Sequence, residues 1–580
     1  MNEIDENGWG HIHHAAFRGF VKSVERFVKA NPDNLELETQ DDLRSTPVLL
    51  AVMSGELEIV DCIVKLGAKL NVMNNQNHGI VELCAFKHYI PLLEYFIELS
   101  EPKLPVWKNL IKFMTSDSED EAEAAAKCLR TLTTPISAGE MNPNWQHVYD
   151  NGITPAITKV IKSSVAESAK IAIVQVLLNI LQQAVVQEQV KATGGIPALV
   201  KHLKASSTQL VQLSAQCLKI MCAKREYADM AVQNAALPAL VKIMQTLKEP
   251  EVLVETCEAV GVICEANPNH QNVFHSTMGA VKATVELYDD VIDRQLQLSL
   301  TMSISKIVRD NETNQNAFVG EGVASKIIPL IRLESHKHQD LRMMAVEAIN
   351  RLAHKNHKTQ KIILEAGIVR PLLHMLKRSR QTETQEKIAG ALWALAGNDT
   401  EERRSMAEAI GVQQLVEFLT SQSEELHYIG SEALGVLAQG PNSKQTEIYK
   451  NNGVGSCVRL LRSDKEHIVM SIIQTLQYLS VSVGFIPHAQ NQTTIAQSRG
   501  IKFLVALMVH SRNELIQVEA AYALGCVSLG EWARNKLYRY AVQLCCSLLL
   551  AFGFYFCMFV QLSTGTPGDT SRIREPSKRF

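Results

Sequence analysis

The sequence lacks the short motifs that frame most catalytic and cofactor sites. It contains no Gly-x-x-x-x-Gly-Lys phosphate loop, no His-Glu-x-x-His metal motif and no Cys-x-x-Cys pair. Serine and histidine are plentiful, but no motif places a nucleophile beside its base. We therefore expect a protein without enzymatic activity, cofactor or bound metal.

The chain is also poor in aromatic residues and in excess charge. Phe, Trp and Tyr make up 6% of it, and 58 Lys and Arg residues face 61 Asp and Glu residues, a formal charge of -3. Such a balance argues against bulk binding to nucleic acid or to a membrane surface. Many small aliphatic side chains favour closely stacked helices over a β-sandwich. At 580 residues the chain is too long for one core, so several domains or a repeat array are expected.

No secretory signal stands at the start, where Met1-Asn-Glu-Ile-Asp-Glu is acidic and polar. We therefore expect a cytoplasmic, reducing location in which the twelve cysteines are free and pack as small hydrophobic residues. The densest histidine group, His11, His13 and His14, stands where a helix is expected to begin. Imidazoles at such a place commonly hydrogen-bond the backbone of the turn, and we prefer that interpretation to a metal site.

A short phrase returns along most of the chain at intervals of 41 to 47 residues. It consists of a glycine or alanine followed by an apolar run, and it begins at Gly152, Gly195, Ala236, Gly279, Gly322, Gly367, Gly411, Gly453 and Gly500. A second phrase follows each anchor, for example Ala391-Leu-Trp-Ala-Leu-Ala396, with apolar residues three and four apart as in a helix. Each unit is therefore a helical hairpin or triplet. No such unit can bury its apolar face alone, so the units must stack.

These phrases resemble the armadillo repeat, which opens with Gly-Ile-Pro-x-Leu-Val and closes with Ala-Leu-x-Asn-Leu-Ala. Gly195-Ile-Pro-Ala-Leu-Val matches the opening, and a divergent earlier unit is found at Lys108–Met114 and Ala126–Leu132. The resemblance implies an all-α fold in which about ten armadillo repeats, over residues 102–530, form a right-handed α-superhelix (a solenoid).

Residues 1–101 show a shorter period. Gly10-His-Ile-His-His-Ala-Ala16 is echoed by Thr46-Pro-Val-Leu-Leu-Ala51, which is followed by Leu66-Gly-Ala-Lys-Leu-Asn71, and a weaker copy begins at Gly79. These residues resemble about three ankyrin repeats, with Thr-Pro-Leu-His-x-Ala and Gly-Ala-x-x-Asn as the signature. In the third copy His88 stands where a short-turn glycine is usual.

Ankyrin repeats followed directly by armadillo repeats are an unusual order. Residues 1–530 resemble the family of animal proteins that carry both types in this order. The ankyrin run starts without a polar capping repeat, so we expect further repeats upstream in a longer form.

The resemblance also identifies groove residues. In armadillo proteins that bind extended peptides, the recurring Asn of the closing helix hydrogen-bonds the peptide backbone. The resemblance gives ten such positions, of which only one keeps the Asn: Thr131, Asn179, Ile220, Val262, Lys306, Arg351, Ala394, Val436, Tyr478 and Cys526. A general receptor for basic localisation signals is therefore not expected, and the groove should read side chains and shape. The candidate groove residues are Asn179, Lys306, Arg351 and Tyr478.

Positive charge is concentrated in residues 332–380, which hold eleven Lys or Arg residues against four acids. An acidic or phosphorylated peptide would be attracted to this excess. The alternative is a solvated outer face, since most of these residues are expected in links. The candidate basic patch is Arg342, Lys355, Lys358 and Lys361.

The repeat pattern stops after Gly530, and no charged residue occurs between Tyr540 and Gly568. The apolar stretch 540–562 predicts a C-terminal hydrophobic helix of about 33 Å, enough to cross a bilayer. A polar, disordered tail is expected at 563–580. Two alternatives remain: a last buried helix, or an alternative or read-through C-terminus that replaces further repeats.

Three functions are compared on this basis. The first is a cytoplasmic scaffold whose ankyrin and armadillo surfaces bind different proteins or peptides, and no nucleic acid. The second is a tail-anchored adaptor inserted in a membrane through 540–562. The third is an enzyme, which the missing motifs disfavour. Repeats alone do not name a partner.

Overall fold

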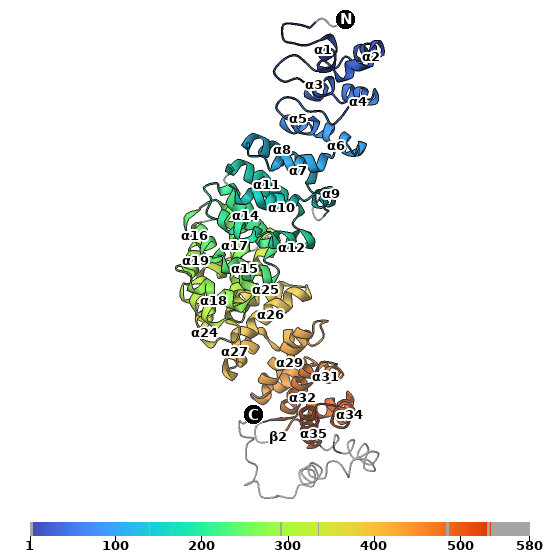
Figure 1. Ribbon diagram of the computed structural model, residues 1–580. Coiled ribbons are helices and arrows are strands. Elements are labelled where there is room, and N and C mark those ends of the chain that lie inside the picture. The colour runs from blue at the N-terminus through green and yellow to red at the C-terminus, as the bar shows by residue number, and fades with distance from the viewer. Residues whose placement is uncertain are drawn as a thin grey trace. The chain divides into compact units, whose positions relative to one another are not determined.

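The computed structural model describes residues 4–137, 140–163, 165–290, 293–333, 336–482, 486–530 and 534 (Figure 1). The chain divides into two compact units, Met1–Ile307 and Val308–Phe580. Almost every described element is an α-helix, as the sequence predicts.

The first unit begins with three antiparallel pairs of short helices. The pairs are α1 (His11–Phe17) with α2 (Val21–Ala30), α3 (Pro47–Ser54) with α4 (Leu57–Lys65), and α5 (Ile80–Lys87) with α6 (Ile90–Leu99). A 3₁₀ helix, η1 (Pro32–Glu36), follows the first pair. The loops between pairs are tied together, since the indole Nε1 of Trp9 donates to Asp41 Oδ2 at 2.8 Å.

Triplets of helices follow, and we call the three helices of a triplet, in chain order, the short, the middle and the long helix. The first two names give the order of the helices and not, in every triplet, their relative length. In the first unit the short helices are α9 (Asn144–Asp150), α12 (Ala184–Ala192), α15 (Arg225–Gln233) and α18 (Pro268–Ser276). The middle helices are α7 (Val106–Met114), α10 (Ile153–Lys162), α13 (Gly195–His202), α16 (Ala236–Thr246) and α19 (Ala280–Asp290). The long helices are α8 (Glu119–Thr133), α11 (Glu167–Ile180), α14 (Thr208–Met221), α17 (Pro250–Ala266) and α20 (Arg294–Ile307).

The second unit repeats the same triplet. Its short helices are α21 (Glu312–Gly320), α24 (His357–Glu365), α27 (Thr400–Ile410), α30 (Asn442–Lys450) and α33 (Ala489–Gln497). Its middle helices are α22 (Val323–Ile331), α25 (Val369–Arg378), α28 (Val412–Phe418), α31 (Gly453–Leu460) and α34 (Gly500–His510). Its long helices are α23 (Gln339–Ala353), α26 (Thr382–Ala396), α29 (Glu424–Ala438), α32 (Glu466–Ser480) and α35 (Glu514–Ser528). A 3₁₀ helix, η2 (His336–His338), and two short antiparallel strands, β1 (Val481–Ser482) and β2 (Ile486–Pro487), lie between them.

Local chemistry sets the helix ends. The corner between short and middle helices takes left-handed backbone at Gly152 (φ 81°), and Ala235 adopts it as well (φ 63°). Polar residues cap the next helices: Ser423 Oγ accepts from the backbone N–H of Leu426 at 3.2 Å. Such caps satisfy donors that a helix leaves unpaired at its start. The phrases that recur in the sequence thus mark where the helices of each triplet begin and end.

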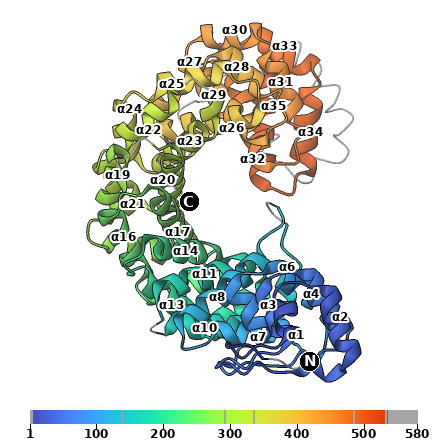
Figure 2. The same ribbon diagram turned by 90° about the horizontal axis from the view of Figure 1, so that it is seen from above.

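The long helices stack side by side within each unit. In the first unit α8, α11, α14, α17 and α20 pack in that order, and in the second α23, α26, α29, α32 and α35 do. Figure 2 shows α14 and α17 on one side of the layer and α13 and α16 on the other. The first helices of the N-terminal pairs continue the stack, because α1 packs on α3, α3 on α5, and α5 on α8.

The apolar tail lies outside the described part of the chain. Neither the hydrophobic helix predicted at 540–562 nor the polar tail predicted at 563–580 can therefore be compared with the structure. No helix among the described residues is both long and apolar enough to cross a membrane.

Candidate protein-interaction surfaces

The groove candidates of the first unit are bonded inside the array. The Nδ2 of Asn179, on α11, donates to the carbonyl oxygen of Arg130 and to the hydroxyl of Thr133, each at 3.2 Å. Lys306, on α20, forms an ion pair with Glu265 at 3.1 Å. Asn179 and Lys306 do not form one cluster, since α14 and α17 lie between their helices. Both side chains bridge neighbouring long helices.

The groove candidates of the second unit are also separate from each other. Arg351, on α23, pairs with Glu347 of the same helix, with 2.7 Å between Nε and Oε1. Tyr478, on α32, remains 37% exposed. Burial raises the pKa of its hydroxyl, and the nearby carboxylates of Glu519 and Glu432 raise it further. Of these two residues, Tyr478 is the one whose side chain forms no hydrogen bond with the described residues.

A buried glutamine holds the backbone at several groove positions. Each of these glutamines lies on a short helix and donates through Nε2 to a carbonyl oxygen near the end of the long helix of its own triplet: Gln271, Gln315, Gln360, Gln445 and Gln492. The acceptors are Lys306, Arg351, Ala394, Tyr478 and Cys526. These are groove positions taken from the resemblance. The buried glutamines thus hold the backbone at these groove positions. The glutamines were not identified from the sequence, although one recurs at a similar distance before successive anchor glycines.

The basic patch predicted from the sequence is only partly assembled. Lys358 and Lys361 lie exposed on α24, and Lys355 precedes that helix with φ 53°. Arg342 lies on α23, apart from these lysines, and lines the groove that is described next. The expectation that the basic residues of 332–380 lie mostly in links is wrong, because α23, α24 and α25 carry seven of the eleven.

A groove of about 1020 Å³ lies between two consecutive triplets of the second unit. Its walls are the end of α22 and the start of α23 on one side, and α25 with the start of α26 on the other. Five arginines and one histidine line it: Arg332, Arg342, Arg370, His374, Arg378 and Arg380. We call it the arginine groove. Three of these residues come from α25 at positions 370, 374 and 378, a spacing that puts them on one face of the helix.

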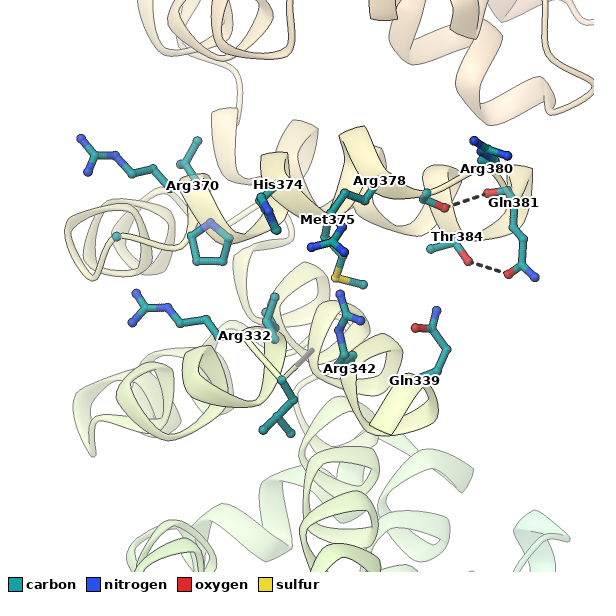
Figure 3. A pocket seen from close by; sticks show the side chains of 16 residues that line it. Arg332, Gln339, Arg342, Arg370, His374, Met375, Arg378, Arg380, Gln381 and Thr384 are labelled. Carbon is teal, nitrogen blue, oxygen red and sulfur yellow. Dashed lines mark hydrogen bonds between the residues drawn. The ribbon is translucent and has the colours of Figure 1, made fainter. Parts of the chain in front are cut away.

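The arginines of the two triplets lie opposite each other (Figure 3). Arg332 and Arg370 lie at one end, and the guanidinium groups of Arg342 and Arg378 point toward one another further along. Buried Met375 lies between the two walls. Five guanidinium groups that surround one groove create a strongly positive site.

The described residues that line the groove include no acidic and no aromatic side chain, since none of them is Asp, Glu, Phe, Tyr or Trp. Arg332, Arg370, Arg378 and Arg380 form no ion pair with any carboxylate in the described ranges. Elsewhere in the unit, by contrast, Arg403 bonds to Glu432 at 3.2 Å and covers the ring of Trp393.

A second groove serves as an internal comparison. It has a volume of about 380 Å³ and lies at the same place in the last two triplets, between the ends of α31 and α34 and the starts of α32 and α35. Its lining includes one arginine, Arg462, together with Asp464 and Glu466. The place in the repeat therefore does not dictate the charge, and the arginine groove is a property of its own two triplets.

His13 bonds to the backbone, and the described cysteines form no disulfide. His13 accepts from the N–H of Gly10 through Nδ1 at 2.9 Å, and its Nε2 lies 2.8 Å from the carbonyl oxygen of Leu37. This agrees with the expectation for the start of that helix. Burial lowers the pKa of His13. The nine described cysteines are free, and no group of three possible metal ligands occurs in the same ranges.

Comparison with known proteins finds one matching repeat family, similar proteins and a similar solved structure. Residues 355–397, which include α24, α25 and α26, match the Armadillo/beta-catenin-like repeat family. The ankyrin and armadillo repeat-containing protein of Mus musculus is 28% identical over 536 residues, which is 92% of this chain. The chain is similar to that protein. Its Homo sapiens counterpart is 28% identical over 46% of this chain.

The chain spans 36% of the length of the mouse ankyrin and armadillo repeat-containing protein and 18% of that of the human one. A solved structure, the crystal structure of an engineered protein, superimposes with a TM-score of 0.63 at 22% identity. It covers 73% of this chain and 99% of its own. This likeness concerns the fold alone. The chain therefore consists largely of stacked helical repeats, with armadillo repeats among them.

Proposed function

We propose that the chain is a non-enzymatic scaffold that binds other proteins, and that the arginine groove receives negatively charged segments of a partner. The observation that carries this proposal is the lining of that groove: five arginines from two triplets, and no carboxylate among the described lining residues. Guanidinium groups are suited to carboxylates and phosphates, because their forked donors match paired oxygens.

The rest of the array supports a scaffold with more than one surface. We propose that residues 1–101 are ankyrin repeats and that they bind a different partner from the armadillo repeats of 102–530. The half-exposed Tyr478 would contribute to binding along the long helices. The relatives named above support this function, since both carry ankyrin and armadillo repeats in their names. We place the scaffold in the cytoplasm.

Fluorescence anisotropy with a labelled peptide of alternating Glu and Ala tests the groove. The full chain should bind it, and Arg370→Glu should weaken binding by about tenfold, because a charge-assisted pair is replaced by repulsion. Lys377→Glu is the matched control, since Lys377 is exposed on the same helix but does not line the groove. Equal weakening by both variants would indicate attraction by overall charge and contradict a specific site.

A further inference from the structure

We infer that the ligand of the arginine groove is a phosphorylated peptide segment with two phosphate groups about four residues apart. This inference rests on the proposed function and makes it narrower. It follows from the pairing of the arginines, the length of the groove and the chemistry of its floor.

The arginines gather at two places along the groove, with one from each triplet at each place. Arg332 and Arg370 lie at one end and extend the same way, and the guanidinium groups of Arg342 and Arg378 point toward one another further along (Figure 3). A single carboxylate brings one negative charge and two acceptor oxygens. A phosphate brings nearly two charges and three acceptor oxygens, so one phosphate can bond to two neighbouring guanidinium groups. Each pair therefore suits a phosphate better than a carboxylate.

The two pairs set the spacing of the ligand. Arg370 and Arg378 are eight residues apart on α25, which corresponds to about 12 Å along the helix axis. An extended peptide rises about 3.3 Å per residue, so about four residues cover that distance. The groove thus fits a segment in which two phosphorylated residues are separated by three others.

The floor of the groove suits a peptide rather than a nucleic acid. Between Arg370 and Arg378 the lining includes the apolar side chains of Pro371 and Met375 beside His374. The described lining has no Phe, Tyr or Trp on which an unpaired base could stack. Gln339, Gln381 and Thr384 lie beyond Arg378 at the other end, where their amide and hydroxyl groups can bond a peptide backbone (Figure 3).

The test uses the full chain and three labelled peptides of one sequence, with phosphoserine, glutamate or serine at the two positions. We expect the doubly phosphorylated peptide to bind about tenfold more tightly than the glutamate peptide, because phosphate carries about twice the charge. Arg378→Glu should abolish that advantage, whereas Lys377→Glu should change it by less than about threefold. Arg370→Glu is a second variant, at the other pair, and circular dichroism checks that each variant folds.

The outcomes separate the two proposals. If the glutamate peptide binds as tightly as the phosphorylated one and Arg378→Glu weakens both, the proposed function stands and the preference for phosphate is wrong. If no peptide binds, or if Lys377→Glu weakens binding as much as Arg378→Glu, both are wrong. If single-stranded RNA or vesicles with phosphoinositides bind more tightly than the phosphopeptide, and lose that binding in Arg378→Glu, the ligand is not a peptide.

Discussion

The Nε2 of Gln445 donates to the carbonyl oxygen of Tyr478 at 2.7 Å, which ties the short helix α30 to the end of the long helix α32. Gln445 is fully buried and also donates to the carbonyl oxygen of Ala438 at 3.0 Å. One side chain thus satisfies backbone acceptors of two consecutive triplets. The same arrangement recurs at Gln360, which bonds to Ala353 and Ala394.

Replacement of this glutamine should destabilise the array. Gln445→Leu leaves buried carbonyl oxygens without a donor, at a cost of about 1–3 kcal/mol in the free energy of unfolding. The exposed Gln413→Leu, on α28, should change it by less than about 0.5 kcal/mol. Urea unfolding of both variants measures the difference. Equal stability of the two would show that the contact contributes nothing.

Acid should loosen the junction between the N-terminal pairs and the first long helix. His78 Nε2 lies 3.1 Å from Glu121 Oε1 on α8. Burial raises the pKa of Glu121, but hydrogen bonds from Ser116 and His78 outweigh it and hold the pKa below its usual value. The carboxylate therefore stabilises the fold above its ordinary pKa, and this contribution is lost as the pH falls through the lower folded pKa.

Glu121→Gln tests that junction. It should cost about 1 kcal/mol at pH 7, and the difference from wild type should vanish in acid. Hydrogen exchange of α5 and α8 is the measurement. Glu98→Gln, exposed on α6, is the control and should leave exchange unchanged. A difference that grows in acid would contradict the assignment.

Asn179 should stabilise the array rather than bind a ligand. Asn179→Ala removes its hydrogen bonds to Arg130 and Thr133 and should lower the stability of the packing of α11 on α8 by about 1 kcal/mol. Thermal unfolding measures this change, and anisotropy with the acidic peptide should show unchanged affinity. Weaker binding at unchanged stability would instead restore Asn179 as a ligand residue.

Two glycines on long helices should respond oppositely to substitution by alanine. A Cβ at Gly261, on α17, would lie 3.0 Å from the Cα of Ser303 on α20. Gly261→Ala should therefore force the helices apart and cost about 1–3 kcal/mol. At Gly525, on α35, nothing described lies within 4 Å, so Gly525→Ala should stabilise the helix by up to about 1 kcal/mol. Chemical unfolding of the two variants measures the change in the free energy of unfolding. A change of the same sign in both variants would contradict the prediction.

The buried cysteines should resist alkylation. Burial raises the pKa of Cys217 to about 12, and it raises the pKa of Cys257 and Cys264 as well. Because the thiolate is the reactive form, these residues should react with N-ethylmaleimide only after unfolding. Cys62, which is less buried, should react earlier. Peptide mass spectrometry at successive times gives the order, and early labelling of Cys257 would contradict it.

The sequence predicts the repeat because the anchors carry backbone constraints. Gly152 takes the left-handed corner itself, whereas in a later triplet Asn452 takes the corner (φ 60°) and Gly453 begins the helix. A Cβ at Gly453 would lie 2.6 Å from Ile448 Cγ2, so glycine is needed there for close packing. The anchor glycine therefore has two different physical causes: a left-handed backbone in one triplet and close packing in another. His88 was correctly placed at a short turn, with φ 55°.

The arginine groove was only partly visible in the sequence. The spacing of Arg370, His374 and Arg378 indicates one helix face, a signal that could have been read. Arg342 comes from the preceding triplet, and whether it faces Arg378 depends on how two triplets stack. Lys355, Lys358 and Lys361 are just as close in sequence but do not line the groove. Linear clustering of charge cannot distinguish these cases.

The stack of α1, α3 and α5 on α8 has a mechanical consequence. Because helices pack on helices throughout, no slack segment separates the N-terminal pairs from the long triplets of the first unit. A flexible tether would let two bound molecules explore many separations, so that each would encounter the other at a local concentration set by tether length. In the first unit the packed helices α1, α3, α5 and α8 instead join the two kinds of repeat directly. A partner bound to the N-terminal pairs and a partner bound to α8–α20 would therefore be held at a fixed distance from each other and in a fixed relative orientation.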